Sequence, residues 1–242
     1  MKEYPAKILL NSKPATYVIR RSKRVRSISL KVSADDGLVV VIPHRYAIRD
    51  AEQALIKHSK WAIKKLDHFE VWDGPRHVPE LVSGAKLLLY GNELTVLVRP
   101  LPGNRKRSRV FLEAENLVVE LGPDADLNPR PLVEKWYRKI AKELLVERVE
   151  ELGGAIGLLP KKVIVGQRTS RWGSCSSRGT LSFCYRLIMA PPEVIDYVVA
   201  HELCHLQHLN HSKRFYTLLD QVYPGHEIYS KWLKENGHGL VI

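Results

Sequence analysis

The chain has 242 residues, of which 45% are hydrophobic and 26% charged, so its composition is that of a folded globular protein and not of a disordered one. No apolar run approaches the roughly 20 residues of a membrane-spanning helix, and the first ten residues lack the apolar core of a secretion signal. Three cysteines are too few for a disulfide framework, which fits a reducing compartment, so we expect a cytoplasmic protein. The lack of a long apolar run predicts that it has no membrane segment.

The net charge is +12, from 38 lysines and arginines against 26 acidic residues. A field of this sign attracts polyanions and phosphate-bearing molecules. Two basic stretches, Arg20–Arg26 and Arg105–Arg109, are candidates for a nucleic-acid contact. The alternative interpretation is that they are solvated charges that protect a sheet edge from aggregation. The sequence does not indicate an oligomeric state.

The first half of the chain contains an internal repeat. Residues 16–66 predict three short strands followed by a helix, with the strands at 17–19, 28–32 and 38–42. Residues 94–145 predict the same course, with strands at 94–98, 110–112 and 117–121 and a helix that Gly153 and Gly154 end. A hairpin around Gly91 joins the two copies.

The last third predicts a different arrangement. A strand begins at Lys162 and continues through residues 167–175, and a return strand follows over Thr180–Met189. Pro191 and Pro192 open a helix that runs to about Leu209, and two shorter helices follow near residues 212–222 and 227–235. We therefore divide the chain into a β-rich region over residues 1–128 and a second domain over 129–242.

The most specific motif is His201-Glu202-Leu203-Cys204-His205. Residues four apart lie on nearly the same face of a helix, so both imidazoles can reach one cation. His-Glu-x-x-His on a helix is the zincin signature, in which the glutamate is the general base. The preceding turn is apolar, as a buried active-site helix requires. The motif predicts a metal site with Glu202 as the catalytic residue.

A catalytic zinc has three protein ligands, so a third is needed. The candidates are His208, His211, His226, Asp220 and Glu227. His208 lies seven residues after His201, which is roughly 10 Å along a helix axis and too far for joint ligation. Asn210 can end the helix and Ser212 can cap the next one, so His211 is the candidate that the chain turns back towards the metal. Cys204 is expected to face the core.

Here the sequence resembles a known family. Arg171-Trp172-Gly173-Ser174-Cys175, the strand at 180–189, and the motif at 201–205 with Asn210-His211-Ser212 and Phe215 are similar to the YgjP-like metallopeptidases, also called metal-dependent hydrolases, which are related to the SprT-like zincins. The resemblance implies an α+β fold in which the β-rich repeat region precedes a minimal zincin-like domain. It also implies one zinc ion held by His201, His205 and His211, with Glu202 catalytic. Manganese, cobalt and nickel also suit imidazole ligands.

The substrate is the open question. A peptide would dock on the strand at 180–189 by β-augmentation. Candidate substrate-binding residues near that strand are Arg171, Trp172, Tyr185 and Arg186. The group that stabilises the oxyanion is left open among Arg171, Tyr185, Tyr229 and His226. Trp172 can equally fill the core.

Two other functions remain open beside a zinc peptidase. Arginines hold phosphate bidentately, so Arg168, Arg171, Arg178 and Arg186 would suit a zinc-dependent nucleoside triphosphate phosphohydrolase (a pyrophosphatase) if they face the metal. Alternatively the protein is a nucleic-acid-associated binding module whose zinc is structural. A peptide or a nucleotide is therefore the expected substrate, and no membrane partner is expected.

Overall fold

The computed structural model describes residues 3–33, 36–69, 71–74, 80–103, 106–123, 128–168 and 171–242. The chain folds into two compact units, Met1–Val78 and Pro79–Ile242. Both contain helices and sheets, which confirms the α+β class. Within the described residues, no helix combines the length and apolarity needed to cross a membrane.

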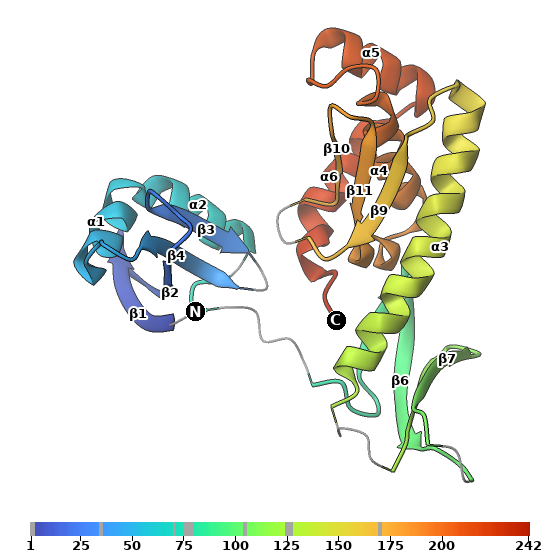
Figure 1. Cartoon of the computed structure of the whole chain (residues 1–242), viewed down its shortest axis with the longest axis horizontal. Coiled ribbons are helices and arrows are strands. Elements are labelled where there is room, and N and C mark those ends of the chain that lie inside the picture. Colours follow the sequence, from blue (N-terminus) through green and yellow to red (C-terminus); the bar gives the residue numbers. More distant parts are fainter. Residues whose placement is uncertain are drawn as a thin grey trace. The chain divides into compact units, whose positions relative to one another are not determined.

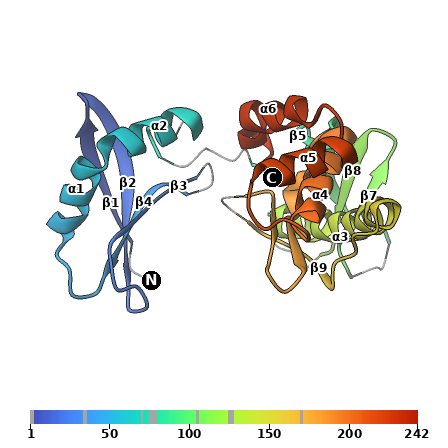
Figure 2. The same cartoon turned by 90° about the horizontal axis from the view of Figure 1, so that it is seen from above.

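The first unit is a four-stranded sheet covered by two helices (Figure 2). Its strands are β1 (Glu3–Leu10), β2 (Lys13–Ser22), β3 (Ser29–Ser33) and β4 (Gly37–Pro43), in the order β1-β2-β4-β3, with β2 and β4 parallel. Alternate residues of β4 pack with α1 (Ile48–Lys57) and α2 (Ser59–Phe69) in one core. The sequence predicted one helix here, but the helix ends at His58 and a second one begins directly after it.

The second unit opens with a sheet of the same topology. The strands β5 (Lys86–Leu89), β6 (Asn92–Pro100), β7 (Arg109–Glu113) and β8 (Asn116–Leu121) have the order β5-β6-β8-β7, and β6 and β8 are parallel. This matches the first sheet strand for strand. β1 and β5 also correspond, although the sequence analysis did not identify β1 as a strand.

The long helix α3 (Arg130–Ile156) joins this sheet to the last third of the chain (Figure 1). Its buried face repeats every three or four residues and packs with both parts in a single core. The Tyr137 hydroxyl donates to the Leu88 carbonyl at 2.8 Å, which ties α3 to β5. The helix ends at Gly157, in the left-handed conformation, and not at Gly153 and Gly154 as predicted.

This shared core explains why the structure divides the chain between residues 78 and 79 and not at residue 128. The sequence analysis assigned the second copy of the repeat to the N-terminal region because the two copies look alike. In the structure the second copy buries its apolar face against α3 and the metal-motif region. The repeat is therefore divided between the two units.

The last third contains the three-stranded sheet β10-β11-β9, with β9 at Lys162–Gly166, β10 at Gly173–Cys175 and β11 at Thr180–Cys184. Two expectations were wrong. β9 ends at Gly166, and β10 is a separate strand on the opposite edge of the sheet; Thr169 and Ser170 lie outside the described residues. The expected strand over Thr180–Met189 stops at Cys184, and a 3-10 helix, η1 (Tyr185–Met189), follows it.

Three helices complete the second unit: α4 (Pro192–Cys204), α5 (Lys213–Val222) and α6 (His226–Asn236), with a final 3-10 turn η2 (Gly237–Gly239). The turn between β5 and β6 supports the approach to α4, because the backbone N–H groups of Tyr90 and Gly91 donate to the carbonyls of Ile188 and Met189. A Cβ at Gly91 would meet Pro191 at 3.1 Å, so this position has little room for a side chain.

Candidate metal centre

The helix α4, which carries the first two histidines, is itself largely buried in the second unit. Pro192 occupies its first turn, and nearly every residue from Val194 to Cys204 is buried. Arg148 of α3 forms a two-bond ion pair with Asp196 of α4, with both N–O distances at 2.7 Å. A bidentate pair fixes orientation as well as distance, so α3 holds α4 in a defined position.

α4 ends at Cys204, with His205 as its C-terminal cap, which is five residues earlier than predicted. The backbone N–H of Leu206 bonds to the carbonyl of Leu203, a tighter 3-10 turn that bends the chain away from the helix axis. The segment that follows leads to His211 just before α5. The sequence analysis expected the turn at Asn210, because asparagine is a residue that can end a helix.

The side chains of His201, His205 and His211 come together. Their ring centroids are 4.7 to 5.1 Å apart, and one ligand atom from each ring lies within 4.8 Å of the others. The backbone carbonyl of His208 accepts a hydrogen bond from Nδ1 of His205 at 2.9 Å, which leaves Nε2 of that ring as the free ligand atom. His208 therefore contributes its backbone and not a ligand.

This arrangement fits a bound divalent metal. Nε2 of His201 and Nε2 of His211 are 3.1 Å apart. Two ligands with bonds of about 2.0–2.1 Å at tetrahedral angles are separated by roughly 3.4 Å. Burial and the neighbouring imidazoles His205, His211 and His226 lower the pKa of His201 to about 3, and burial lowers the pKa of His205. Both rings are therefore neutral near pH 7, the form that binds metals.

Phe215 of α5 supports the three rings from one side. Its side chain is fully buried, and its ring centroid lies 4.9 Å from His201, 4.5 Å from His205 and 4.9 Å from His211. An aromatic wall in contact with every imidazole restricts their rotation and excludes water from that side. The sequence analysis named Phe215 only as part of the family resemblance.

Glu202 lies next to these rings with only 5% of its surface exposed. Burial raises the pKa of its carboxyl to about 7, although the positive charge of Arg171 acts in the opposite direction. Its Oε2 atom has no hydrogen-bond partner in the described part of the chain. A buried carboxylate with a free oxygen and a pKa near neutrality has the properties of a proton acceptor and donor at physiological pH.

Gly173 of β10 makes room for Glu202, which the sequence analysis did not foresee. A Cβ at this glycine would lie 2.5 Å from both Cγ and Oε1 of Glu202, closer than atoms can approach. Because the position lacks a side chain, β10 can run directly beside the carboxylate. Its place directly after Arg171 and Trp172 in the family motif was the only available signal.

Among the described residues, the outer edge of β10 has backbone groups without hydrogen-bond partners beside Glu202. Cys184 N–H bonds to the Trp172 carbonyl, and Ser176 N–H bonds to the Thr180 carbonyl, which fixes the alternation of the β10–β11 ladder. In an antiparallel ladder every second residue turns its N–H and C=O away from the partner strand. Gly173 and Cys175 are those residues, so their backbone groups face outward from the sheet.

The predicted substrate residues lie in different surroundings. Arg171 is exposed and acts electrostatically on Glu202. Trp172 is half-buried, packs on the core and lies against Gly237. Tyr185 is buried beside α3, with the Arg138 guanidinium 5.0 Å from its ring centroid. Arg186 donates to the backbone carbonyl of Arg168 at 3.0 Å.

The other arginines named for a phosphate site and for nucleic-acid contact are placed as follows. Arg178 is exposed in the turn between β10 and β11. Arg20 pairs with Glu3 and Asp36, and Arg109 pairs with the buried Glu120. Arg105 lies outside the described residues. The structure therefore brings Arg171 into electrostatic reach of Glu202 and gives Arg20 and Arg109 acidic partners.

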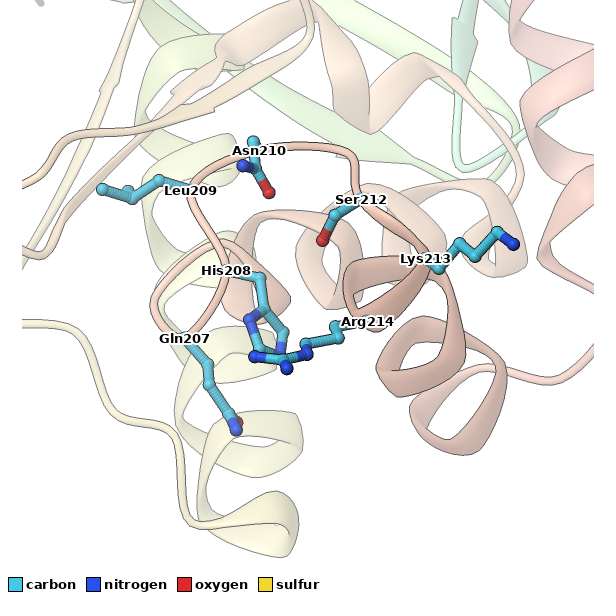
Figure 3. A pocket seen from close by; sticks show the side chains of 7 residues that line it. All are labelled: Gln207, His208, Leu209, Asn210, Ser212, Lys213 and Arg214. Atoms are coloured by element: carbon cyan, nitrogen blue, oxygen red, sulfur yellow. The ribbon is translucent and has the colours of Figure 1, made fainter.

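A hollow of about 590 Å³ lies beside the segment that carries His211 (Figure 3). It is lined by residues before and after that histidine, namely Gln207, His208, Leu209, Asn210, Ser212, Lys213 and Arg214. The sequence from Leu203 to Leu219 contains no acidic residue, so this wall of the hollow carries only neutral and positive side chains.

The family model of the YgjP-like, metallopeptidase domain matches residues 26–236, which is most of the chain. The chain belongs to the YgjP-like metallopeptidase family. This confirms the resemblance found at residues 171–175 and 201–215, and it identifies the protein as a metal-dependent hydrolase of the peptidase type. His201, His205 and His211 are residues that can hold the metal ion this family implies.

Among solved structures, the chain is similar to the crystal structure of the metallopeptidase zymogen of abylysin from Pyrococcus abyssi. The similarity covers 37% of this chain and 90% of that one, with 20% sequence identity and a TM-score of 0.34. No curated protein matches the chain.

Proposed function

We propose that this protein is a cytoplasmic zinc-dependent peptidase in which His201, His205 and His211 hold the zinc ion and Glu202 is the general base. The observation that carries the proposal is the convergence of three imidazole rings beside a buried carboxylate with a free oxygen. The cytoplasm is proposed because all three cysteines are free thiols.

The zinc ion, when bound, supplies Lewis acidity and makes a water molecule acidic enough to react at neutral pH. The role of Glu202 follows from its own environment. With a pKa of about 7 it can accept the proton of the attacking water at Oε2 and later deliver that proton to the leaving amine. The positive charge of Arg171 favours the ionised form of Glu202, which is the form that starts the reaction.

The substrate chain is proposed to pair with the outer edge of β10. The sequence analysis expected a peptide to dock on the strand at 180–189. However, β11 is the central strand of its sheet, and both of its edges are already paired with β10 and β9. The free backbone groups of Gly173 and Cys175 lie on the edge next to Glu202. An extended peptide that adds a strand there would pass the carboxylate with its own backbone held by hydrogen bonds.

The decisive test is proteolysis by the Glu202→Gln variant. Wild type should cleave denatured casein, and Glu202→Gln should lose on the order of 10²–10⁴-fold in rate while it keeps its metal, because the amide cannot accept the proton. Glu193→Gln is the matched control, since Glu193 is exposed in the first turn of the same helix. Equal rates for wild type and Glu202→Gln would refute the proposal. Turnover of nucleoside triphosphates without cleavage of casein would replace the peptidase by the phosphohydrolase.

The close approach of β10 to Glu202 has its own test in Gly173→Ala. The added methyl group must displace Glu202, and displacement of a catalytic group by about 1 Å costs roughly 100-fold in rate. Gly166→Ala is the control in the same sheet, because a Cβ at Gly166 meets nothing within 4 Å. Both variants should retain the metal. A Gly173→Ala enzyme as fast as Gly166→Ala would show that the contact with Glu202 does not matter.

A further inference from the structure

A second group of potential metal ligands lies where α5 ends and α6 begins. Asp220 is in the last turn of α5, and His226 and Glu227 open α6 after the turn at Gly225. Nε2 of His226 is 3.1 Å from Oδ1 of Asp220 and 3.9 Å from Oε1 of Glu227. One ligand atom from each of the three residues lies within 4.8 Å of the others.

A divalent cation would satisfy all three groups at once. A carboxylate oxygen only accepts hydrogen bonds, so neither Asp220 nor Glu227 can donate to the other. The imidazole of His226 is 5% exposed and lies at the N-terminal end of α6. Neither Asp220 nor Glu227 pairs with a lysine or arginine anywhere in the described residues.

The imidazole is also held in a fixed orientation. The ring of His226 stacks on Tyr197 of α4, with centroids 6.2 Å apart and an interplanar angle of 9°, and on Tyr216 of α5, at 6.1 Å and 21°. Both neighbours therefore hold the ring with Nε2 turned towards the two carboxylates. The carboxylates themselves are largely exposed, so water can complete a coordination shell on the outer side.

We propose that Asp220, His226 and Glu227 form a second divalent-cation site, separate from the His201 centre. One nitrogen and two carboxylate oxygens suit zinc, manganese or cobalt, and the spacings of 3.1 and 3.9 Å bracket the roughly 3.4 Å expected between ligands of one zinc ion. The ion links the end of α5 to the start of α6. α5 carries Phe215, and α6 packs against Tyr197 through Tyr229. The ion therefore stabilises both supports of the first metal centre.

The test counts metal ions on the full chain. After equilibrium dialysis against zinc, elemental analysis should find two ions on wild type, one on Asp220→Asn and one on His211→Ala, which removes a ligand of the other centre. Glu235→Gln is the matched control, because Glu235 is an exposed carboxylate near the end of the same helix α6. It should keep two ions.

Glu227→Gln with cobalt as the probe provides a second measurement, since cobalt absorption reports each site separately. It should lose one of two spectral components, and the other should vanish in His211→Ala. Equal zinc content in wild type and Asp220→Asn would overturn the second site. Loss of zinc in Asp220→Asn with none lost in His211→Ala would support the second site and instead contradict the metal centre of the proposed function.

Discussion

The two copies of the repeat build sheets of the same strand order and then use them differently. The first sheet is closed by its own helices, α1 and α2, and has a core of its own. The second sheet has no such pair and is covered by α3, whose other contacts are with α4, η1 and β9 of the metal-motif region. The comparison shows that one topology can be an independent unit in one place and the foundation of a catalytic site in another.

The largest effect should follow from cutting the chain at the two candidate boundaries. A fragment of residues 79–242 keeps the shared core and should fold and bind metal. A fragment of residues 129–242 loses Leu87, Leu89, Leu94, Val96, Leu117 and Val119 from that core. Each buried side chain contributes about 1.5–3 kcal/mol, and a domain has only about 5–15 kcal/mol in total. Circular dichroism should show no cooperative unfolding for the shorter fragment; a cooperative transition there would restore the boundary at 128.

Matched core truncations should separate the two units. Phe215→Ala and Leu55→Ala each remove a fully buried side chain, one beside the three histidines and one in the first unit. Both should lower the free energy of unfolding by about 2–5 kcal/mol. Only Phe215→Ala should also weaken metal binding, as measured by competition with a chelator. Equal metal affinity in the two variants would show that Phe215 does not organise the imidazoles.

The buried carboxyl of Glu202 predicts a pH effect that is confined to the second unit. Its pKa of about 7 in the metal-free folded protein is above the value of 4.5 for an unburied carboxyl, so its contribution to stability is present below pH 4.5 and is lost as the pH rises through 7. Glu202→Gln lacks this loss. In EDTA, the variant should therefore gain on the order of 3 kcal/mol over wild type between pH 4.5 and pH 8.

Urea unfolding of both proteins at the two pH values measures this difference. The control is Glu193→Gln, whose stability relative to wild type should not change with pH because Glu193 is exposed. A difference between Glu202→Gln and wild type that stays constant from pH 4.5 to pH 8 would mean that Glu202 is not held in a buried, unfavourable environment.

The smallest effect concerns one position that the two copies share. Tyr17 of β2 pairs with Leu38 of β4, and Val96 of β6 pairs with Leu117 of β8. Arg20 lies three residues after Tyr17, and Arg99 lies three residues after Val96. Arg20 pairs with Glu3 and Asp36, which are partly exposed, whereas Arg99 pairs with Glu120, which is buried. Arg99→Gln should therefore lower the melting temperature of its unit more than Arg20→Gln does. The reverse order would show that the burial of the acidic partner does not decide how much each arginine contributes to stability.

Much of the fold could be predicted from the sequence because it depends on local signals. The apolar runs around Ile19, Val40 and Val119 predicted the strands of both copies, and the spacing of His201 and His205 predicted a metal helix. β1 was not predicted; it contains Pro5, and a proline is tolerated on an edge strand such as β1.

The remaining features depend on contacts between distant segments. Nothing near Cys204 signals a helix end, since the bend there is a tight turn supported by the tertiary structure. The central place of β11 and the free edge of β10 follow from the pairing of β9 with β11, which no local pattern reveals. The packing of the second sheet against α3 also could not be predicted, because both copies of the repeat bury similar apolar faces.

Anomalous diffraction at the zinc edge from crystals of the zinc-loaded full chain tests the central claim most directly. The account predicts a peak bonded to ring nitrogens of His201, His205 and His211, with the carboxylate of Glu202 beside it and not bonded to it. Zinc coordinated elsewhere, with no peak among these three rings, would contradict the account.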